Sequence, residues 1–300
     1  GRATWTYDAL GQVLSEQRSE GSGSSTTYTY DSRRNMTRCS QNASVTSLVY
    51  DMANQLQTAT SNIGITTYSY DADGNVTGRV TPSVGRTTYQ WSAANQLVGV
   101  VDTDGNRSTY TYSGDGLRTH GEGGDDPVEF VWSGQQLQAT LDSEGVAFTT
   151  YTNEPNEYGS VVSQTSGSTL YFLYDALSAT RLLVGEDGAV EASYTYTPYG
   201  ERVTRTGTAD TSYQFGGQIG YYTDESLQLI YVRARWLDVA IGAWLSQDPK
   251  ASGTEFNGTS QYRYAGNNPN TYIDPSGELF QLPNSPPASG GGGTASPPTG

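Results

Sequence analysis

The chain has 300 residues, a formal net charge of −15 and an apolar fraction of 34%, with 23 Tyr, 36 Gly and a single cysteine, Cys39. Abundant Tyr, Thr and Ser indicate β-strands and argue against a helical bundle or coiled coil. The acidic balance argues against a nucleic-acid-binding face and against docking on anionic membranes. One cysteine excludes an internal disulfide scaffold and a cysteine-rich zinc site.

No apolar run approaches the length of a membrane-spanning helix, so we expect no direct membrane insertion. The first residues lack the charged and apolar regions of a signal peptide. The chain opens with Gly1 rather than Met and enters a patterned segment at once. We therefore interpret it as a piece of a longer protein.

A short motif recurs along the chain, in which Thr or Ser alternates with aromatic residues and the strand is closed by Asp or Ser. Its closing positions are 8, 31, 51, 71, 92, 113 and 133, at spacings of 20 to 23 residues, and the motif returns near 175 and 197. The clearest copies end in the pairs Tyr7-Asp8, Tyr30-Asp31, Tyr50-Asp51, Tyr70-Asp71 and Tyr174-Asp175. A fixed period of this size predicts a repeat architecture.

Each copy continues with a turn and a second short strand, as in Ala72-Asp73-Gly74-Asn75 followed by Val76. Residues that tolerate positive φ between alternating strands predict antiparallel hairpins. The alternation places Tyr28 and Tyr30 on one face, so stacked copies would align their rings in rows. The hydroxyl of a Tyr ring can remain in contact with water while the ring packs. A sheet face lined with Tyr therefore favours a sheet that curves around a hollow.

The repeats resemble the YD-repeat, or RHS-repeat, family. A second block, residues 215–277, is similar to the RHS-associated core module of that family. Its ordered motifs are Arg233-Ala234-Arg235-Trp236, Leu245-Ser246-Gln247-Asp248-Pro249, Asn267-Asn268-Pro269 and Asp274-Pro275-Ser276-Gly277. The resemblance covers nearly all of residues 4–277. It implies an all-β fold in which antiparallel YD-repeat hairpins form a spiralling, curved sheet, a hollow shell closed by an RHS core plug.

Three regions follow from this reading: a YD-repeat β-shell over residues 1–214, an RHS-associated core domain over 215–277, and a Pro/Gly-rich flexible tail over 278–300. We expect Arg233 and Arg235 to alternate on one strand face and to pair with acids of the plug. The other predicted plug residues are Trp236, Trp244, Asn267, Asn268 and Pro269.

Two carboxylates stand out, Asp248 and Asp274, which lie 26 residues apart. In family members that cut themselves, the core module is similar to an aspartic protease acting once on its own chain, just after the Asp-Pro-x-Gly block. Two close carboxylates can share a proton, so that one activates water and the other protonates the leaving group. The alternative is that both Asp-Pro pairs are turn residues. Any enzyme activity would be this single self-cleavage.

The resemblance places such a cut between Gly277 and Phe280, that is, among Gly277, Glu278, Leu279 and Phe280. The chain departs from many relatives at two positions. Ala243 stands before Trp244 where relatives have Arg, and Glu278 directly follows the Asp-Pro-x-Gly block where relatives have an apolar residue.

Other candidate sites have simpler explanations. The segments Asp71–Asn75 and Asp102–Asn106 look like calcium loops but lack a distant bidentate Glu, so we predict hairpin turns and no metal site. The only histidine, His120, precedes a polar loop and does not suggest a catalytic triad. No phosphate-binding glycine loop is present, and we expect no cofactor.

The favoured function is a structural β-shell, secreted or on the cell surface, that encloses or displays a C-terminal cargo, with possible self-cleavage. The alternative is a purely structural extracellular fibre, tube or adhesion element that assembles through sheet edges. The expected partners are the chain's own C-terminal cargo or other copies of the shell. A cell-surface protein or glycan is a further possible partner, because exposed Tyr and Trp side chains can form a sugar platform.

Overall fold

The computed structural model describes residues 2–19, 23–123, 128–158, 160–250 and 259–283. Twenty strands between residues 3 and 207 form one sheet, and four short strands between residues 222 and 244 form another. The all-β fold predicted from the repeats is confirmed. We call the described part of residues 208–283 the inner module and the large sheet the shell.

The shell strands follow the repeat, with two strands in each copy. They are β1 (Ala3–Tyr7), β2 (Val13–Arg18), β3 (Ser24–Tyr30), β4 (Met36–Gln41), β5 (Ser44–Tyr50), β6 (Leu56–Ser61), β7 (Gly64–Tyr70), β8 (Val76–Thr81), β9 (Gly85–Trp91), β10 (Leu97–Val101), β11 (Arg107–Tyr112), β12 (Arg118–Glu122), β13 (Val128–Ser133), β14 (Gln136–Leu141), β15 (Ala147–Asn153), β16 (Val161–Ser166), β17 (Ser168–Tyr174), β18 (Thr180–Gly185), β19 (Val190–Tyr196) and β20 (Arg202–Gly207). The inner module contains β21 (Tyr222–Asp224), β22 (Leu229–Val232), β23 (Arg235–Asp238), β24 (Ala243–Trp244) and the 3₁₀ helices η1 (Gly217–Ile219) and η3 (Tyr264–Asn267).

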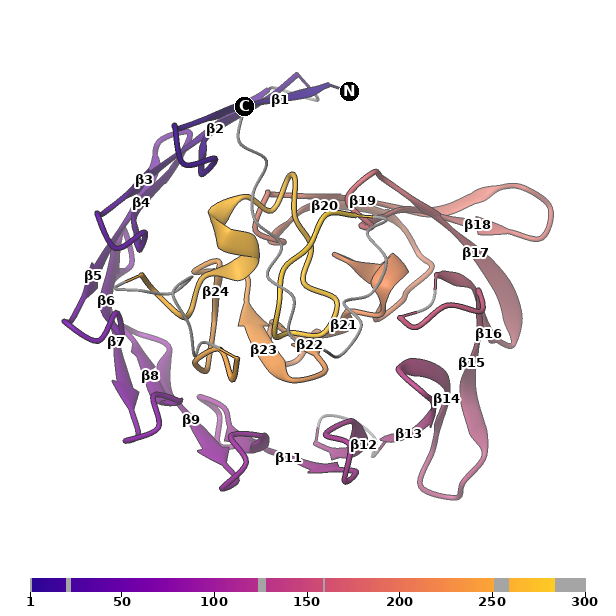
Figure 1. Ribbon diagram of the computed structural model, residues 1–300. Coiled ribbons are helices and arrows are strands. Elements are labelled where there is room, and N and C mark those ends of the chain that lie inside the picture. Colours follow the sequence, from indigo (N-terminus) through magenta and orange to yellow (C-terminus); the bar gives the residue numbers. More distant parts are fainter. Residues whose placement is uncertain (1, 20–22, 124–127, 159, 251–258, 284–300) are drawn as a thin grey trace.

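Every shell strand is antiparallel to its neighbours in sequence. Within the described residues, β1 pairs only with β2 and β20 only with β19, so the sheet has two free edges and does not close on itself. The pairing register shifts beside the last aromatic residue of a copy, for example at Tyr30, Tyr50, Tyr70 and Tyr174. Such bulges increase the local twist and bend of a sheet, which suits the curved shell in Figure 1.

The inner module lies within the curve of the shell (Figure 1). Rings align on the concave face, and the inner module packs against them within the curved shell. One buried cluster joins Tyr28 and Phe172 of the shell with Tyr213 and Trp244 of the inner module. Ring pairs that cross the interface are Tyr70–Tyr262, Tyr110–Trp236, Tyr112–Tyr231, Phe130–Tyr222, Tyr151–Tyr213 and Tyr196–Phe215.

In several copies, a flat side chain at the end of the odd-numbered strand bonds to the preceding copy. The Tyr112 hydroxyl donates to the Leu97 carbonyl at 2.7 Å. Where Trp or Asn replaces Tyr, the bond persists: Trp91 Nε1 donates to the Val76 carbonyl and Asn153 Nδ2 to the Leu137 carbonyl. The same bond is made by Tyr30 to Val13, Trp132 to Arg118 and Tyr174 to Val161. At these six strand ends the side chain is flat and carries a hydrogen-bond donor at its tip.

The Asp that follows organises the turn. Asp71 Oδ1 accepts the backbone N–H groups of Asp73 at 3.0 Å and Asn75 at 2.8 Å, while Oδ2 accepts Asn75 Nδ2 at 3.0 Å. Asn75 Nδ2 also donates to Asn95 Oδ1 in the next copy at 2.8 Å. Gly74 sits between them at a φ of 83°, where a side chain is strained. These carboxylate oxygens bind their own turn, so the calcium-like segment is a hairpin turn, as predicted.

Arg118 in β12 is buried against the inner module with 1% exposure. Its guanidinium carbon lies 4.2 Å from the centroid of the Phe130 ring and 5.3 Å from that of Tyr110. The rings of Tyr222, Tyr231 and Trp236 lie between these distances. Among the described residues Nε and Nη2 have no hydrogen-bond partner, so the charge is stabilised by ring faces. This cation joins the shell to the inner module.

We expect Tyr174→Phe to lower the free energy of unfolding by roughly 1–3 kcal/mol, because the buried Val161 carbonyl loses its donor. Tyr171→Phe is the matched control, since Tyr171 lies in the same strand and is 43% exposed. That variant should stay within about 0.5 kcal/mol of the unchanged chain. Urea unfolding measures both, and equal effects of the two variants would contradict the role assigned to the hydroxyl.

Candidate functional site

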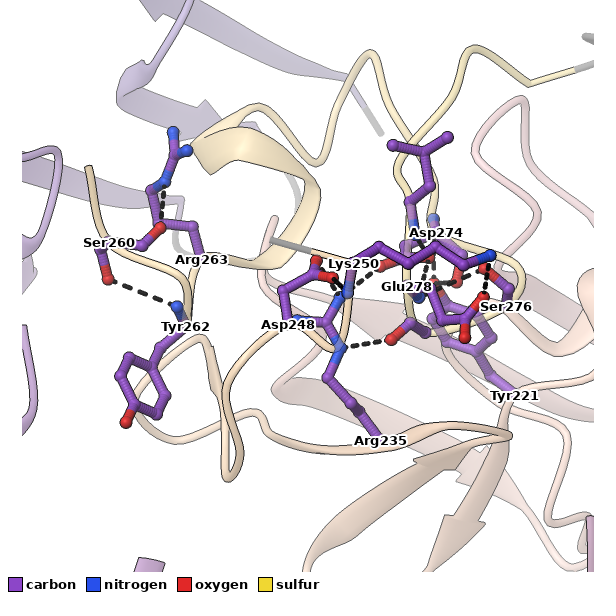
Figure 2. A network of polar contacts seen from close by, with 12 residues as sticks. Tyr221, Arg235, Asp248, Lys250, Ser260, Tyr262, Arg263, Asp274, Ser276 and Glu278 are labelled. Carbon is purple, nitrogen blue, oxygen red and sulfur yellow. Dashed lines mark hydrogen bonds and ion pairs between the residues drawn. The ribbon is translucent and has the colours of Figure 1, made fainter. Parts of the chain in front are cut away.

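The two predicted carboxylates meet at one arginine, although they are distant in sequence. Arg235, at the start of β23, has its Nη2 3.0 Å from Asp248 Oδ2 and 3.0 Å from Asp274 Oδ2 (Figure 2). All three side chains are buried, with exposures of 2%, 7% and 2% respectively. The guanidinium also lies over the Trp244 ring, 4.3 Å from its centroid. The expected pairing of Arg235 with acids of the inner module is present.

The chain just after the Asp-Pro-Ser-Gly block is bound to the same cluster. Asp274 Oδ1 accepts the backbone N–H groups of Glu278 at 3.0 Å and Leu279 at 3.1 Å. Arg235 Nε donates to the carbonyl oxygen of Gly277. The peptide bond between Gly277 and Glu278 is thus held from both sides, its carbonyl by a cation and its N–H by a carboxylate.

Gly277 has a φ of 73°, and a Cβ atom there would collide with the Val232 carbonyl oxygen. Only glycine therefore fits at this point without moving the backbone. Glu278 turns outward, and its Oε2 lies 2.5 Å from Nζ of Lys250. The Lys250 backbone N–H in turn donates to Asp248 Oδ1 at 2.9 Å, which links both carboxylate segments.

Burial raises the pKa of Asp248 and of Asp274 above the ordinary value. The Arg235 guanidinium opposes this and lowers the pKa of each, while the Asp248 charge raises that of Asp274. Desolvation therefore favours protonation of the two carboxyls, and the positive charge of Arg235 opposes it. Such a balance suits a carboxyl pair that exchanges one proton.

Arg233 is placed differently from the prediction. It lies in the turn between β22 and β23 at a φ of 46°, so it does not share a strand face with Arg235. Its guanidinium donates to backbone carbonyls, those of Gln135 at 2.9 Å, Ile219 at 3.1 Å and Pro275 at 2.5 Å. Arg233 therefore ties the shell to the Asp-Pro-Ser-Gly block.

The remaining inner-module motifs contact the turns of the shell. Asn267 Nδ2 donates to the Arg34 carbonyl at 2.7 Å, and the Tyr262 hydroxyl donates to the Gly74 carbonyl at 2.7 Å. Trp236 and Pro269 are buried, whereas Asn268 is half-buried. These residues dock the inner module onto the positive-φ positions of the repeat turns.

Leu279 and Phe280 are more exposed than the carboxylates, at 41% and 37%. The Phe280 ring packs on Tyr272, with centroids 5.3 Å apart.

In the described part of the chain, no group of three or more His, Cys, Asp or Glu side chains could hold a metal ion. None of the helices in these residues has the length and hydrophobicity of a membrane span. Most of the predicted tail, from residue 284, lies outside the described residues.

We expect Arg235→Met to lower the free energy of unfolding by roughly 3–5 kcal/mol near neutral pH, because two buried carboxylates lose their cation. Without that cation the pKa of both carboxyls rises further in the folded state. Stability should therefore recover as the pH falls and be lost as it rises through the raised pKa.

Urea unfolding at about pH 7 and about pH 5 measures this effect. Adding Asp248→Asn and Asp274→Asn to the same variant should restore part of the loss. Arg107→Met, on an exposed residue, is the control. A loss that stays constant between the two pH values would argue against buried, unpaired carboxylates.

The chain is similar to several known proteins over part of their length. It is 34% identical over 107 residues to salivary gland surface protein 1 of Aedes aegypti, covering 36% of this chain and 3% of that protein. It is 27% identical over 162 residues to the tRNA3(Ser)-specific nuclease WapA of Bacillus spizizenii, covering 52% of this chain and 7% of that one. The chain thus spans a small part of both relatives.

Two solved structures share the fold. The TcdB2-TccC3-TEV crystal structure aligns with a TM-score of 0.52 at 17% identity, covering 92% of this chain and 18% of that one. The Photorhabdus luminescens Tc holotoxin pore with the TccC3-D651A mutation aligns with a TM-score of 0.52 at 17% identity, covering 94% and 18%. The family model of the teneurin YD-shell matches residues 2–270. With its repeating hairpins and the inner module they surround, this chain belongs to the teneurin YD-shell family.

Proposed function

We propose that this shell encloses or displays a C-terminal cargo of a secreted or surface-exposed protein, and that it cuts its own chain once, between Gly277 and Glu278. The proposal rests on the contacts of this peptide bond, whose carbonyl oxygen accepts a hydrogen bond from Arg235 and whose N–H donates to Asp274. The cargo part is supported by the fold shared with TcdB2-TccC3 structures and by the position of residues 278–283 in the module that the shell surrounds.

The geometry suggests a role for each side chain. Asp274 Oδ1 lies 3.0 Å from the Glu278 nitrogen, which places it to protonate that nitrogen as the peptide bond breaks. Arg235 Nε binds the Gly277 carbonyl oxygen, where negative charge develops when water adds to the carbon. Asp248, on the other side of Arg235, is the base that takes the proton from water. The products are a carboxylate at Gly277 and a free amine at Glu278.

The reaction needs one proton on the carboxyl pair, so Asp274 must be protonated before it acts. Burial raises the pKa of Asp274, which favours the acid form. Arg235 opposes protonation, and this opposition makes the reaction slow near neutral pH. We therefore infer that self-cleavage accelerates in mild acid.

Intact-mass measurement of the purified chain tests the proposal. We expect a fragment ending at Gly277, formed faster at about pH 5 than at about pH 7. Asp248→Asn and Asp274→Asn should leave the chain uncut, whereas Asp104→Asn, in an exposed turn, should be cut normally. If the unchanged chain keeps its full mass under both conditions, self-cleavage is contradicted and the function is that of a structural shell alone.

A second function, assembly into an extracellular fibre, tube or adhesion surface, is favoured by the free edges of β1 and β20. Unpaired strand edges are templates for pairing with another copy. This function predicts concentration-dependent oligomers in sedimentation experiments. Thr4→Lys with Thr6→Lys, on the β1 edge, should abolish them, and Thr27→Lys, inside the sheet, should not. A monomer at all concentrations would exclude it.

A further inference from the structure

A cavity of about 370 Å³ lies where the first hairpin, β1–β2, faces the segments around residues 175–181 and 196–198. These segments are far apart in the sequence, but all of them line the same space. The volume lies in the range of small-molecule sites. Its lining includes Arg2, Trp5, Arg18, Arg181, Tyr196 and Asn270.

Three residues that line this cavity carry a hydrogen-bond donor with no acceptor among the described residues. Arg18 Nη2 donates to Glu16 Oε1 at 2.7 Å and to the Tyr196 carbonyl, but Arg18 Nε has no partner among the described residues. The Tyr196 hydroxyl and Asn270 Nδ2 are likewise buried without a partner. Buried donors are normally satisfied. These three are shielded from solvent, so a ligand in the cavity would reach them only after their side chains move.

The charge at the cavity is opposite in sign to that of the whole chain. Three guanidinium groups, those of Arg2, Arg18 and Arg181, line it together with the carboxylates of Glu16 and Asp175. The Arg181 guanidinium is 3.9 Å from Asp175 Oδ2, too far for a good hydrogen bond. The site therefore has excess positive charge in a chain with a net charge of −15. A guanidinium fork suits a carboxylate, which it can bind through two parallel hydrogen bonds.

The rest of the lining is flat and apolar. Trp5 is 37% exposed, and its indole is held in place by a hydrogen bond from Nε1 to Glu16 Oε1 at 3.0 Å. The buried rings of Tyr196 and Phe215 and the side chain of Pro198 complete this wall. A fixed indole beside ring faces favours a ligand with a flat or ring-shaped body.

We propose that this cavity binds a small organic carboxylate that carries a ring. The carboxylate lies toward Arg18 and Arg181 and accepts the unpartnered donors after a small movement of their side chains. The ring packs against Trp5. The site is separate from the Arg235 cluster and does not depend on self-cleavage.

Calorimetric titration and Trp fluorescence test the proposal with benzoate and glucuronate as probes. Each has a neutral counterpart of similar shape, benzamide and glucose. We expect saturable binding of at least one acid, weakened by salt, and at least about tenfold weaker binding of its neutral counterpart. The acid that binds more tightly shows whether the site prefers a carboxylate on an aromatic ring or one on a sugar ring.

Two variants locate the site. Arg181→Gln, whose side chain is 31% exposed, should fold and weaken binding by about tenfold, which corresponds to about 1.4 kcal/mol. Arg107→Gln removes the same charge away from the cavity and should bind normally. Failure of both acids to saturate, equal binding of acid and neutral probe, or unchanged affinity in Arg181→Gln would each overturn the proposal.

Discussion

The fold depends on one hydrogen bond, repeated from copy to copy, between the last side chain of a strand and a backbone carbonyl of the preceding copy. Tyr, Trp and Asn all occur at this position, as at Tyr112, Trp91 and Asn153, and share only a flat shape with a donor at its end. The bond fixes how each hairpin stacks on the one before it. The Asp or Ser that follows shapes the next turn, so a short motif controls both stacking and direction.

The inner module depends on this regularity. Because the hairpins stack evenly, their positive-φ turn residues form a row of accessible carbonyls, and Tyr262 and Asn267 bind two of them. On the concave face, Arg118 places a charge among aromatic rings from both parts. The Arg235 cluster lies inside this frame. Asp274 is held against the Gly277–Glu278 peptide, and Arg235 joins it to Asp248.

Local features of the sequence predicted the repeat, the hairpins and the turns, because a strand and its turn are encoded within about twenty residues. They could not predict that Asp248 and Asp274 meet at Arg235, since that contact depends on how the inner module folds back. Alternation placed Arg233 on a strand, but the positive φ at this position turns it away. The repeats alone could not predict which concave-face rings the inner module covers, because those contacts join segments far apart in the sequence.

The contacts between the inner module and individual turns limit how the shell can change in length. Asn267 binds the turn at Arg34 and Tyr262 the turn at Gly74, two copies further on. Insertion or deletion of a hairpin between these turns would shift one contact by a whole copy and uncouple the two. A hairpin added before β1 would leave both untouched. Variation in repeat number among related shells should therefore concentrate ahead of the copies that the inner module touches.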